Sequence, residues 1–275
     1  MMRLLVLCTL CAILHVNARP LVFAPLPLEN TQKAFETFSP MVTHLENALQ
    51  ESITFRYETR YDDIITLFAS NKIDIAYFGP LPFSVLAKQS PFAKPLVTFH
   101  EQDGSHGYRC VLVKFATTQI NTQDPKTLKV ALTQPLSTCD YTKTKVLLEQ
   151  KFGLSLDELS YRYLERHDAV ALNVVRGEFD LGGIKESIAK EHASLGIDIV
   201  ATSPLLPGFT LVVNTRTLTP EQIETIKKTL LSTPKEIYTT WGKEISYGMS
   251  EAHYELFDTI EPSNPVFYIP TQGNF

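Results

Sequence analysis

The hydrophobic pattern of the chain alternates between two periods. Short apolar runs typical of strands are separated by segments whose apolar side chains recur every three or four residues, as in amphipathic helices. In the first half, such a helix is predicted over 37–50, where Phe38, Met41, Val42 and Leu45 share one face. A second amphipathic segment covers 62–69, and the strand-like runs of this half are 20–25, 53–58, 73–78 and 111–113.

The second half repeats this alternation. Strands are predicted at 129–132, 161–163, 179–184, 197–202 and 211–214, and helices at 169–175, from 185 to about 195, and at 218–231. A further helix is predicted to start at Ser137 or Thr138. Thr219, Pro220 and Glu221 are typical of a helix start, with a capping hydroxyl, proline at the first helical position and an acid in the first turn.

Strand–helix alternation in two blocks predicts an α/β protein with two small sheets. No linker rich in Pro, Gly or Ser separates the blocks, which favours two lobes joined by crossing strands. We place the crossings near 115–120 and 202–206. The predicted first lobe is 19–117 with 203–275, and the second is 118–202.

The N-terminus has the pattern of a secretory signal peptide over 1–18. Arg3 precedes an apolar run from Leu4 to Leu14, and Val16-Asn17-Ala18 offers small residues at the spacing that a signal peptidase requires. The run is too short to span a bilayer stably. We therefore expect the mature chain to begin near Arg19 and to be exported.

The charge balance excludes recruitment of nucleic acid or anionic lipid by a basic field, because the formal net charge is −5. No phosphate-binding P-loop, dinucleotide glycine fingerprint, nucleophile elbow or zinc-binding histidine pair occurs. His100 and His106 flank Glu101 and Asp103, in a setting that predicts a solvated loop and no metal site. We expect no enzyme activity, no cofactor and no bound metal. Nothing indicates an oligomer, so a monomer is expected.

Two of the four cysteines leave with the signal peptide, so Cys110 and Cys139 remain. In an oxidising compartment they either pair as a disulfide or stay exposed as reactive thiols.

Four segments could bind a small ligand. Ser137, Thr138 and Cys139 follow a strand and open a predicted helix, where free N–H groups and the helix dipole favour an anion, although Ser and Thr are also common plain caps. Tyr77, Gly79 and Pro80 form a predicted tight turn at the end of a buried strand, a usual place for ligands in α/β sheets; packing in the core is the alternative.

His167, the third candidate, stands at a strand-to-helix junction. The fourth segment, 179–183, holds two glycines that allow close backbone approach. Additional candidates are Tyr61, Asp180, Lys185 and Glu186.

These segments together resemble the phosphate, phosphite and phosphonate solute-binding proteins of ABC transporters, a branch of the type II periplasmic-binding-protein fold. The resemblance covers nearly all of the mature chain. It rests on Tyr61-Asp62-Asp63, the run 72–80 (Lys-Ile-Asp-Ile-Ala-Tyr-Phe-Gly-Pro), Pro135-Leu136-Ser137-Thr138, the run 167–171, the run 177–180 and the return element 203–208.

The resemblance implies a two-lobe protein that closes on a small oxyanion as a Venus flytrap. It implies that Ser137 and Thr138 hold the anion from one lobe and that the loop with Tyr77 meets it from the other, with His167 as a further contact. An ABC transporter permease would be the partner, in the periplasm.

One departure from the family pattern keeps an alternative open. Cys139 and Asp140 follow Ser-Thr, where the family often has Ser, Thr or Gly. A carboxylate there is unfavourable unless it points away from the anion or caps the helix. Cys139 with Cys110 could instead form a thiol site, and the broader group includes periplasmic arsenite receptors of sensor histidine kinases. A sensor-linked receptor for a thiol-seeking oxyanion is therefore the second hypothesis.

Overall fold

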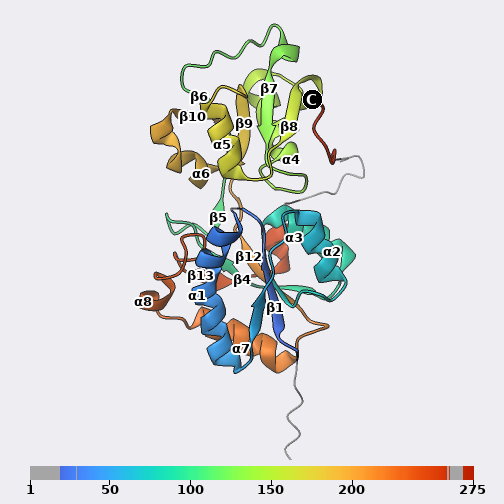
Figure 1. The fold of residues 1–275 in the computed structure, drawn as a ribbon, viewed down its shortest axis with the longest axis vertical. Coiled ribbons are helices and arrows are strands. Elements are labelled where there is room, and N and C mark those ends of the chain that lie inside the picture. Colours follow the sequence, from blue (N-terminus) through green and yellow to red (C-terminus); the bar gives the residue numbers. More distant parts are fainter. Residues whose placement is uncertain (1–18, 29, 259, 261–268) are drawn as a thin grey trace, which may run out of the picture.

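The computed structural model describes residues 19–28, 30–258, 260 and 269–275, and its strands form two separate sheets joined by a two-stranded one. Figure 1 shows the two lobes one above the other, with β5 between them. The predicted signal peptide, 1–18, lies outside the described residues. Within the described ranges, no helix is both long enough and apolar enough to cross a membrane.

The first lobe is built on a six-stranded mixed sheet of order β13-β4-β12-β3-β1-β2. Strands β1, β2 and β3 are parallel, whereas β12 and β13 run antiparallel to their neighbours. Its elements are β1 (Leu21–Pro25), α1 (Thr31–Leu49), β2 (Ile53–Phe55), α2 (Tyr61–Ala69), β3 (Ile75–Phe78), α3 (Pro80–Gln89), β4 (Ala93–Phe99), β12 (Thr210–Asn214), α7 (Pro220–Leu231), α8 (Lys235–Tyr238), β13 (Met249–Glu251) and η4 (Tyr254–Phe257).

The second lobe is built on a five-stranded sheet of order β10-β6-β9-β7-β8. Along β6, Val111 and Val113 pack with α5 and α6, and Leu112 packs on the opposite face with α4, as the two-residue period of a strand requires. Its elements are β6 (Cys110–Phe115), η1 (Pro125–Thr127), β7 (Lys129–Leu132), α4 (Tyr141–Phe152), η2 (Leu156–Glu158), β8 (Ser160–Tyr163), α5 (His167–Val175), β9 (Leu181–Lys185), α6 (Glu186–Glu191), η3 (Ala193–Leu195) and β10 (Ile197–Thr202).

The lobes are joined by β5 (Gly107–Tyr108), which pairs antiparallel with β11 (Leu206–Pro207). The return segment runs from the end of β10 at Thr202 to the start of β12 at Thr210 and overlaps the predicted 202–206. The first crossing was predicted too late: β6 pairs with β9 and β10 and so belongs to the second lobe, not to 19–117. The apolar run 111–113 is equally compatible with either sheet, which is why its pattern does not reveal the lobe.

The C-terminal residues also depart from the predicted first lobe. Residues 269–275 lie beside β8 of the second lobe (Figure 1). The Asn274 side chain accepts from the N–H of Tyr161 and donates to the carbonyl of Leu159, and the Tyr163 hydroxyl donates to the carbonyl of Pro270. The tail thereby covers the exposed edge of β8, a position that folded proteins usually protect.

Some helix boundaries differ from the predictions for local reasons. Helix α1 begins at Thr31 rather than Thr37, because the Asn30 side chain caps it by accepting from the N–H of Lys33. The predicted tight turn at Gly79-Pro80 is the start of α3, with Pro80 at the first helical position. At Thr219 the predicted start of α7 is confirmed, and Gln222 completes a capping box there.

Candidate anion site between the lobes

Four helices begin at the boundary between the lobes. Helices α2 and α3 of the first lobe and α4 and α5 of the second each follow a strand or loop that ends there, with first residues Tyr61, Pro80, Tyr141 and His167. Unpaired N–H groups and the positive end of the helix dipole make each such terminus favourable for an anion. Their convergence concentrates these effects in one place.

A small cavity lies among these termini, with room for about one water molecule between the lobes. None of the described residues that line it is acidic. The lining residues are Leu26, Tyr61, Gly79, Pro82, Tyr108, Ser137, Thr138, Cys139, His167, Lys185 and Phe209.

The Ser137–Thr138 segment forms a turn before α4, not the first turn of the helix as predicted. Helix α4 begins at Tyr141, and the N–H of Asp140 donates to the carbonyl of Ser137. Leu136 in the same loop has a left-handed backbone (φ 70°), which is strained for a residue with a side chain. The turn places both hydroxyls, buried, at the cavity.

Two tyrosine hydroxyls contact this turn. Tyr61, at the start of α2, is hydrogen-bonded to Ser137, and Tyr108, in β5, is hydrogen-bonded to Thr138. Burial raises the pKa of both phenols, so both remain neutral donors at physiological pH. Tyr61 was a candidate from the sequence; Tyr108 was not.

Direct hydrogen bonds also join the lobes. The N–H of Leu81, in α3, donates to Thr138 Oγ1 at 3.0 Å, and the N–H of Tyr61 donates to the side-chain oxygen of Gln134 at 2.9 Å. The same Gln134 side chain donates to the carbonyl of Glu165 at 3.0 Å. The Ser137–Thr138 turn is therefore held by the opposite lobe as well as by its own.

His167 is the first residue of α5 and is buried at the cavity. Its Nδ1 accepts from the N–H of Lys185 at 3.2 Å, which leaves the proton of the neutral ring on Nε2. Burial and the nearby charge of Lys185 lower the pKa of His167 to about 4. The ring is therefore a neutral hydrogen-bond donor at physiological pH.

Lys185 ends β9 and connects both lobes by ion pairs. Its ammonium lies 2.8 Å from a carboxylate oxygen of Glu101 and 3.3 Å from one of Glu244, both in the first lobe. It also lies over the rings of Tyr108 (5.4 Å) and Phe209 (5.1 Å). Although burial acts to lower it, the two carboxylates hold the pKa of Lys185 above its usual value.

The Asp140 carboxylate, which would be unfavourable beside an anion, points back to the end of β7. Its Oδ1 accepts from the N–H of Thr133 at 2.9 Å, and its Oδ2 is buried without a hydrogen-bond partner among the described residues. Burial raises the pKa of Asp140 well above its usual value, which favours the neutral form. Through its hydrogen bond with the N–H of Thr133, Asp140 connects the turn to the end of β7.

Cys110 and Cys139 form a disulfide, the first of the two predicted possibilities. It connects the start of β6 to the turn before α4, with the two Cα atoms 4.9 Å apart. Cys139 still lines the cavity, but it offers no thiolate there. The bond fixes the residue directly after Thr138.

Several predicted site residues lie elsewhere. The Tyr77 ring stacks on Phe209 at 5.1 Å, one layer behind the cavity, and its hydroxyl donates to the carbonyl of Glu244. Gly79 lines the cavity, whereas Pro80 does not. Asp180 lies at the opposite end of the second sheet, where its carboxylate accepts from the N–H of Lys129.

The predicted loop 179–183 is mostly strand β9, and its glycines serve packing rather than ligand approach. A Cβ on Gly182 would lie 2.7 Å from Val170 of α5, and one on Gly183 would lie 1.9 Å from Thr144 Oγ1 of α4. Helices on both faces of the sheet therefore require glycine here.

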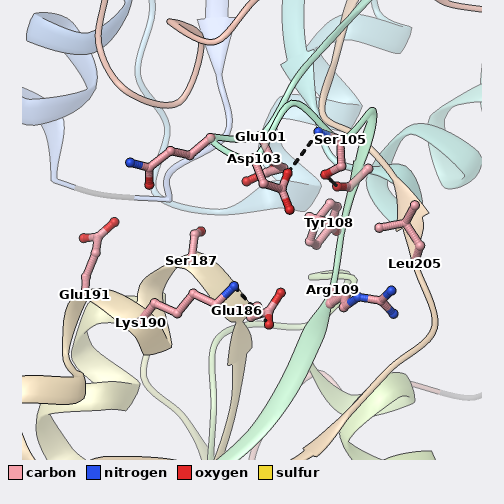
Figure 2. A pocket seen from close by; sticks show the side chains of 12 residues that line it. Glu101, Asp103, Ser105, Tyr108, Arg109, Glu186, Ser187, Lys190, Glu191 and Leu205 are labelled. Carbon is pink, nitrogen blue, oxygen red and sulfur yellow. Dashed lines mark hydrogen bonds and ion pairs between the residues drawn. The ribbon is translucent and has the colours of Figure 1, made fainter.

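Glu186 faces a larger open groove, about 560 Å³, shown in Figure 2. It lies between the loop with Glu101 and Asp103 and helix α6 with Glu186 and Glu191, and Lys190 is paired with Glu186. Four carboxylates make this groove unsuited to an anion. In the described part of the chain, no group of three or more His, Cys, Asp or Glu side chains is arranged to hold a metal ion.

The sequence reasoning missed Tyr108, Phe209 and the Leu81 amide. Tyr108 and Phe209 directly follow Gly107 and Gly208, and Leu81 follows Pro80 at the start of α3. Gly107 and Gly208 sit where a Cβ would meet backbone, at 2.1 Å and 2.8 Å respectively. A glycine directly before an aromatic residue at a strand end was the available signal.

Comparisons with known proteins show the family to which the chain belongs. The sequence profile of the family described as ABC transporter, phosphonate, periplasmic substrate-binding protein matches residues 23–260. The phosphate-import protein PhnD of Mycolicibacterium smegmatis is 25% identical over 224 residues, which cover 75% of this chain and 70% of that protein.

Solved structures show the same fold. PhnD1 from Prochlorococcus marinus, in complex with methylphosphonate, has a TM-score of 0.76 at 16% identity, covering 87% of this chain and 95% of that one. A binding protein component of an ABC phosphonate transporter from Pseudomonas aeruginosa has a TM-score of 0.73 at 16% identity, covering 88% and 84%. The fold is thus the two-lobe periplasmic-binding-protein type, and the chain belongs to the family of periplasmic substrate-binding proteins of ABC phosphonate transporters.

Proposed function

We propose that this protein captures a small phosphorus oxyanion, of the phosphonate, phosphite or phosphate class, in the cavity between its lobes and presents it to an ABC transporter permease. The observation that carries the proposal is that the starts of α2, α3 and α5 and the turn before α4 meet at a cavity whose described lining residues include no carboxylate. The family and the names of its relatives favour phosphorus oxyanions over other anions.

The ligand contacts we propose come from both lobes. Ser137, Thr138 and the Nε2–H of His167 belong to the second lobe, whereas Tyr61 and the N–H of Leu81 belong to the first. Thr138 Oγ1 already accepts from Leu81, so an anion must take the place of one partner when the lobes close on it. A ligand that contacts both lobes only in the closed form shifts the hinge equilibrium toward closure.

The protein acts in this proposal as a monomer that binds without turnover. The side chains around the cavity donate hydrogen bonds, and both described cysteines are consumed by the disulfide. The arsenite-receptor hypothesis needs free thiolates at Cys110 and Cys139, so the same disulfide disfavours it.

Isothermal titration calorimetry of the chain from Arg19 tests the proposal. The probes are phosphate, phosphite, methylphosphonate, sulfate, arsenate and arsenite, each with and without reductant. We expect saturable binding of at least one phosphorus oxyanion without reductant, and its loss in the Ser137→Ala/Thr138→Ala variant. The exposed pair Ser232→Ala/Thr239→Ala is the matched control and should bind as the unmodified chain does.

Two outcomes would overturn the proposal. Undiminished binding in the Ser137→Ala/Thr138→Ala variant would remove the assigned site. Binding of arsenite alone, and only with reductant, would replace transport by the sensor hypothesis. Phosphorus-31 NMR of the bound ligand should show no chemical conversion, since turnover would make the protein an enzyme.

A further inference from the structure

Lys185 stands out among the buried charged groups because the oxyanion site described above does not use it. Its side chain is only 6% exposed, and it is the one lysine or arginine among the described residues that line the cavity. The neighbouring His167 is neutral at physiological pH. The cavity wall therefore carries one permanent charge, and that charge is positive.

The position of this ammonium is fixed from three sides. Glu101 and Glu244 hold it by ion pairs at 2.8 Å and 3.3 Å, and the rings of Tyr108 and Phe209 lie beneath it at 5.4 Å and 5.1 Å. Both rings line the cavity, whereas neither carboxylate does. A buried ammonium with two carboxylate partners cannot rotate away into water without leaving those carboxylates unpaired.

The rest of the described lining offers no carboxylate to a second cation. Besides the groups that suit the oxyanion and Cys139, it consists of Leu26, Gly79, Pro82 and the two rings, over which Lys185 already lies. A cationic substituent on the ligand would lose its hydration, gain no carboxylate and face the Lys185 ammonium in a desolvated site. An uncharged substituent of the same size would lose less hydration and would not be repelled by that ammonium.

We propose that Lys185 is a specificity-determining residue that restricts the protein to phosphorus oxyanions with no substituent or an uncharged one, and excludes aminoalkylphosphonates. The inference rests on the proposed function, because it concerns the substituent of a ligand bound at the same site. Lys185 acts here by repulsion, which is one of the two ways in which a site discriminates between similar ligands.

A matched ligand pair tests this. Propylphosphonate and 2-aminoethylphosphonate have the same chain length and differ by a terminal methyl or ammonium group. In titration calorimetry we expect the unmodified chain to bind propylphosphonate on the order of 100-fold more tightly, as expected for two like charges at close range in a partly desolvated site. In Lys185→Met the ratio should fall to unity or below, because the repelling charge is gone and Glu101 and Glu244 keep their negative charges without it.

Two further variants keep the test decisive. Lys190→Gln removes a neighbouring exposed lysine outside the cavity and should keep the ratio of the unmodified chain. Since Lys185→Met leaves Glu101 and Glu244 buried without their cation, the variant Lys185→Met/Glu101→Gln/Glu244→Gln removes all three charges together. It should fold as judged by circular dichroism and should show the same loss of discrimination.

Each remaining outcome is informative. Equal affinities for the two ligands in the unmodified chain, or an unchanged ratio in both Lys185 variants, would overturn the inference. Binding of methylphosphonate but of neither longer ligand would also overturn it, because the size of the cavity would then set the limit. Failure to bind any phosphorus oxyanion would contradict the proposed function itself, which separates the two failures.

Discussion

Thr138 and Leu81 lie on opposite lobes and are joined by one hydrogen bond, from the N–H of Leu81 to Thr138 Oγ1 at 3.0 Å. The N–H of Leu81 belongs to the start of α3 in the first lobe, whereas Thr138 belongs to the turn before α4 in the second lobe. The contact therefore couples closure of the lobes to the geometry of the oxyanion site. Any change at Thr138 should affect ligand binding more than it affects folding.

Thr138→Ala tests this coupling. The substitution removes the hydroxyl that contacts both Leu81 and Tyr108, so we expect oxyanion affinity to fall by about 10- to 100-fold, the effect of one or two lost hydrogen bonds to a charged ligand. Titration calorimetry measures the affinity, and thermal unfolding measures the stability. Thr138→Ser keeps the hydroxyl and should bind nearly normally. An equal loss of affinity in Thr138→Ser would assign the effect to packing of the methyl group.

The disulfide predicts a second measurable effect. Cys110 and Cys139 are 29 residues apart, so the bond should stabilise the folded state by about 3.5 kcal/mol through the entropy of the unfolded chain. Cys110→Ser/Cys139→Ser should lose that stability in chemical denaturation. It should also bind the oxyanion more weakly, because the residue after Thr138 is released. Unchanged affinity in this variant would show that the hydrogen bonds of the turn hold it without the disulfide.

Most elements of the fold could be predicted because their patterns are local. The strands around Val130, Ile184 and Val212 are short apolar runs, and the capping box at Thr219 specifies a helix start by itself. The strand order and the placement of β6 depend instead on pairing between distant segments. Val111 and Val113 would be buried equally well in either sheet, so periodicity does not reveal the lobe to which they belong.

The site could be predicted only in part, for a similar reason. Ser137, Thr138 and His167 adjoin helix starts, which are visible in the sequence, and all three line the cavity. Tyr77 and Asp180 also occur beside promising motifs, yet one packs behind Phe209 and the other lies at the far end of its sheet. Three-dimensional packing decides which face of a strand, and which of its two ends, lies at the cleft between the lobes.

His167 predicts a specific pH dependence of stability. Its pKa is about 4 in the folded protein, below the usual value of 6.5, because burial and the Lys185 charge oppose protonation. The unfolded chain therefore binds a proton that the folded chain does not, and stability falls as the pH drops from about 6.5 to about 4. The full contribution is about 3 kcal/mol.

Chemical denaturation between pH 4 and pH 7 measures this effect. His167→Gln should be less sensitive to acid over that window than the unmodified chain, whereas His253→Gln, at an exposed position, should not differ. Asp140 contributes with the opposite sign, because its pKa is raised, but it is present in all three proteins and cancels in the comparison. Parallel pH profiles for His167→Gln and the unmodified chain would contradict the assignment of a neutral, buried ring.

Gly183 predicts a double-mutant effect at the base of the site. A Cβ there would lie 1.9 Å from Thr144 Oγ1 and 2.9 Å from the carbonyl oxygen of Cys139, to which Thr144 donates at 3.1 Å. Gly183→Ala should therefore cost about 1–3 kcal/mol of stability by overpacking and should weaken oxyanion binding by displacing the turn. Thr144→Ala removes the closest atom, so the double variant should be less destabilised than the sum of the two single variants. Strict additivity would show that the clash is relieved elsewhere, and the close packing of β9 against α4 would then not be what positions the turn.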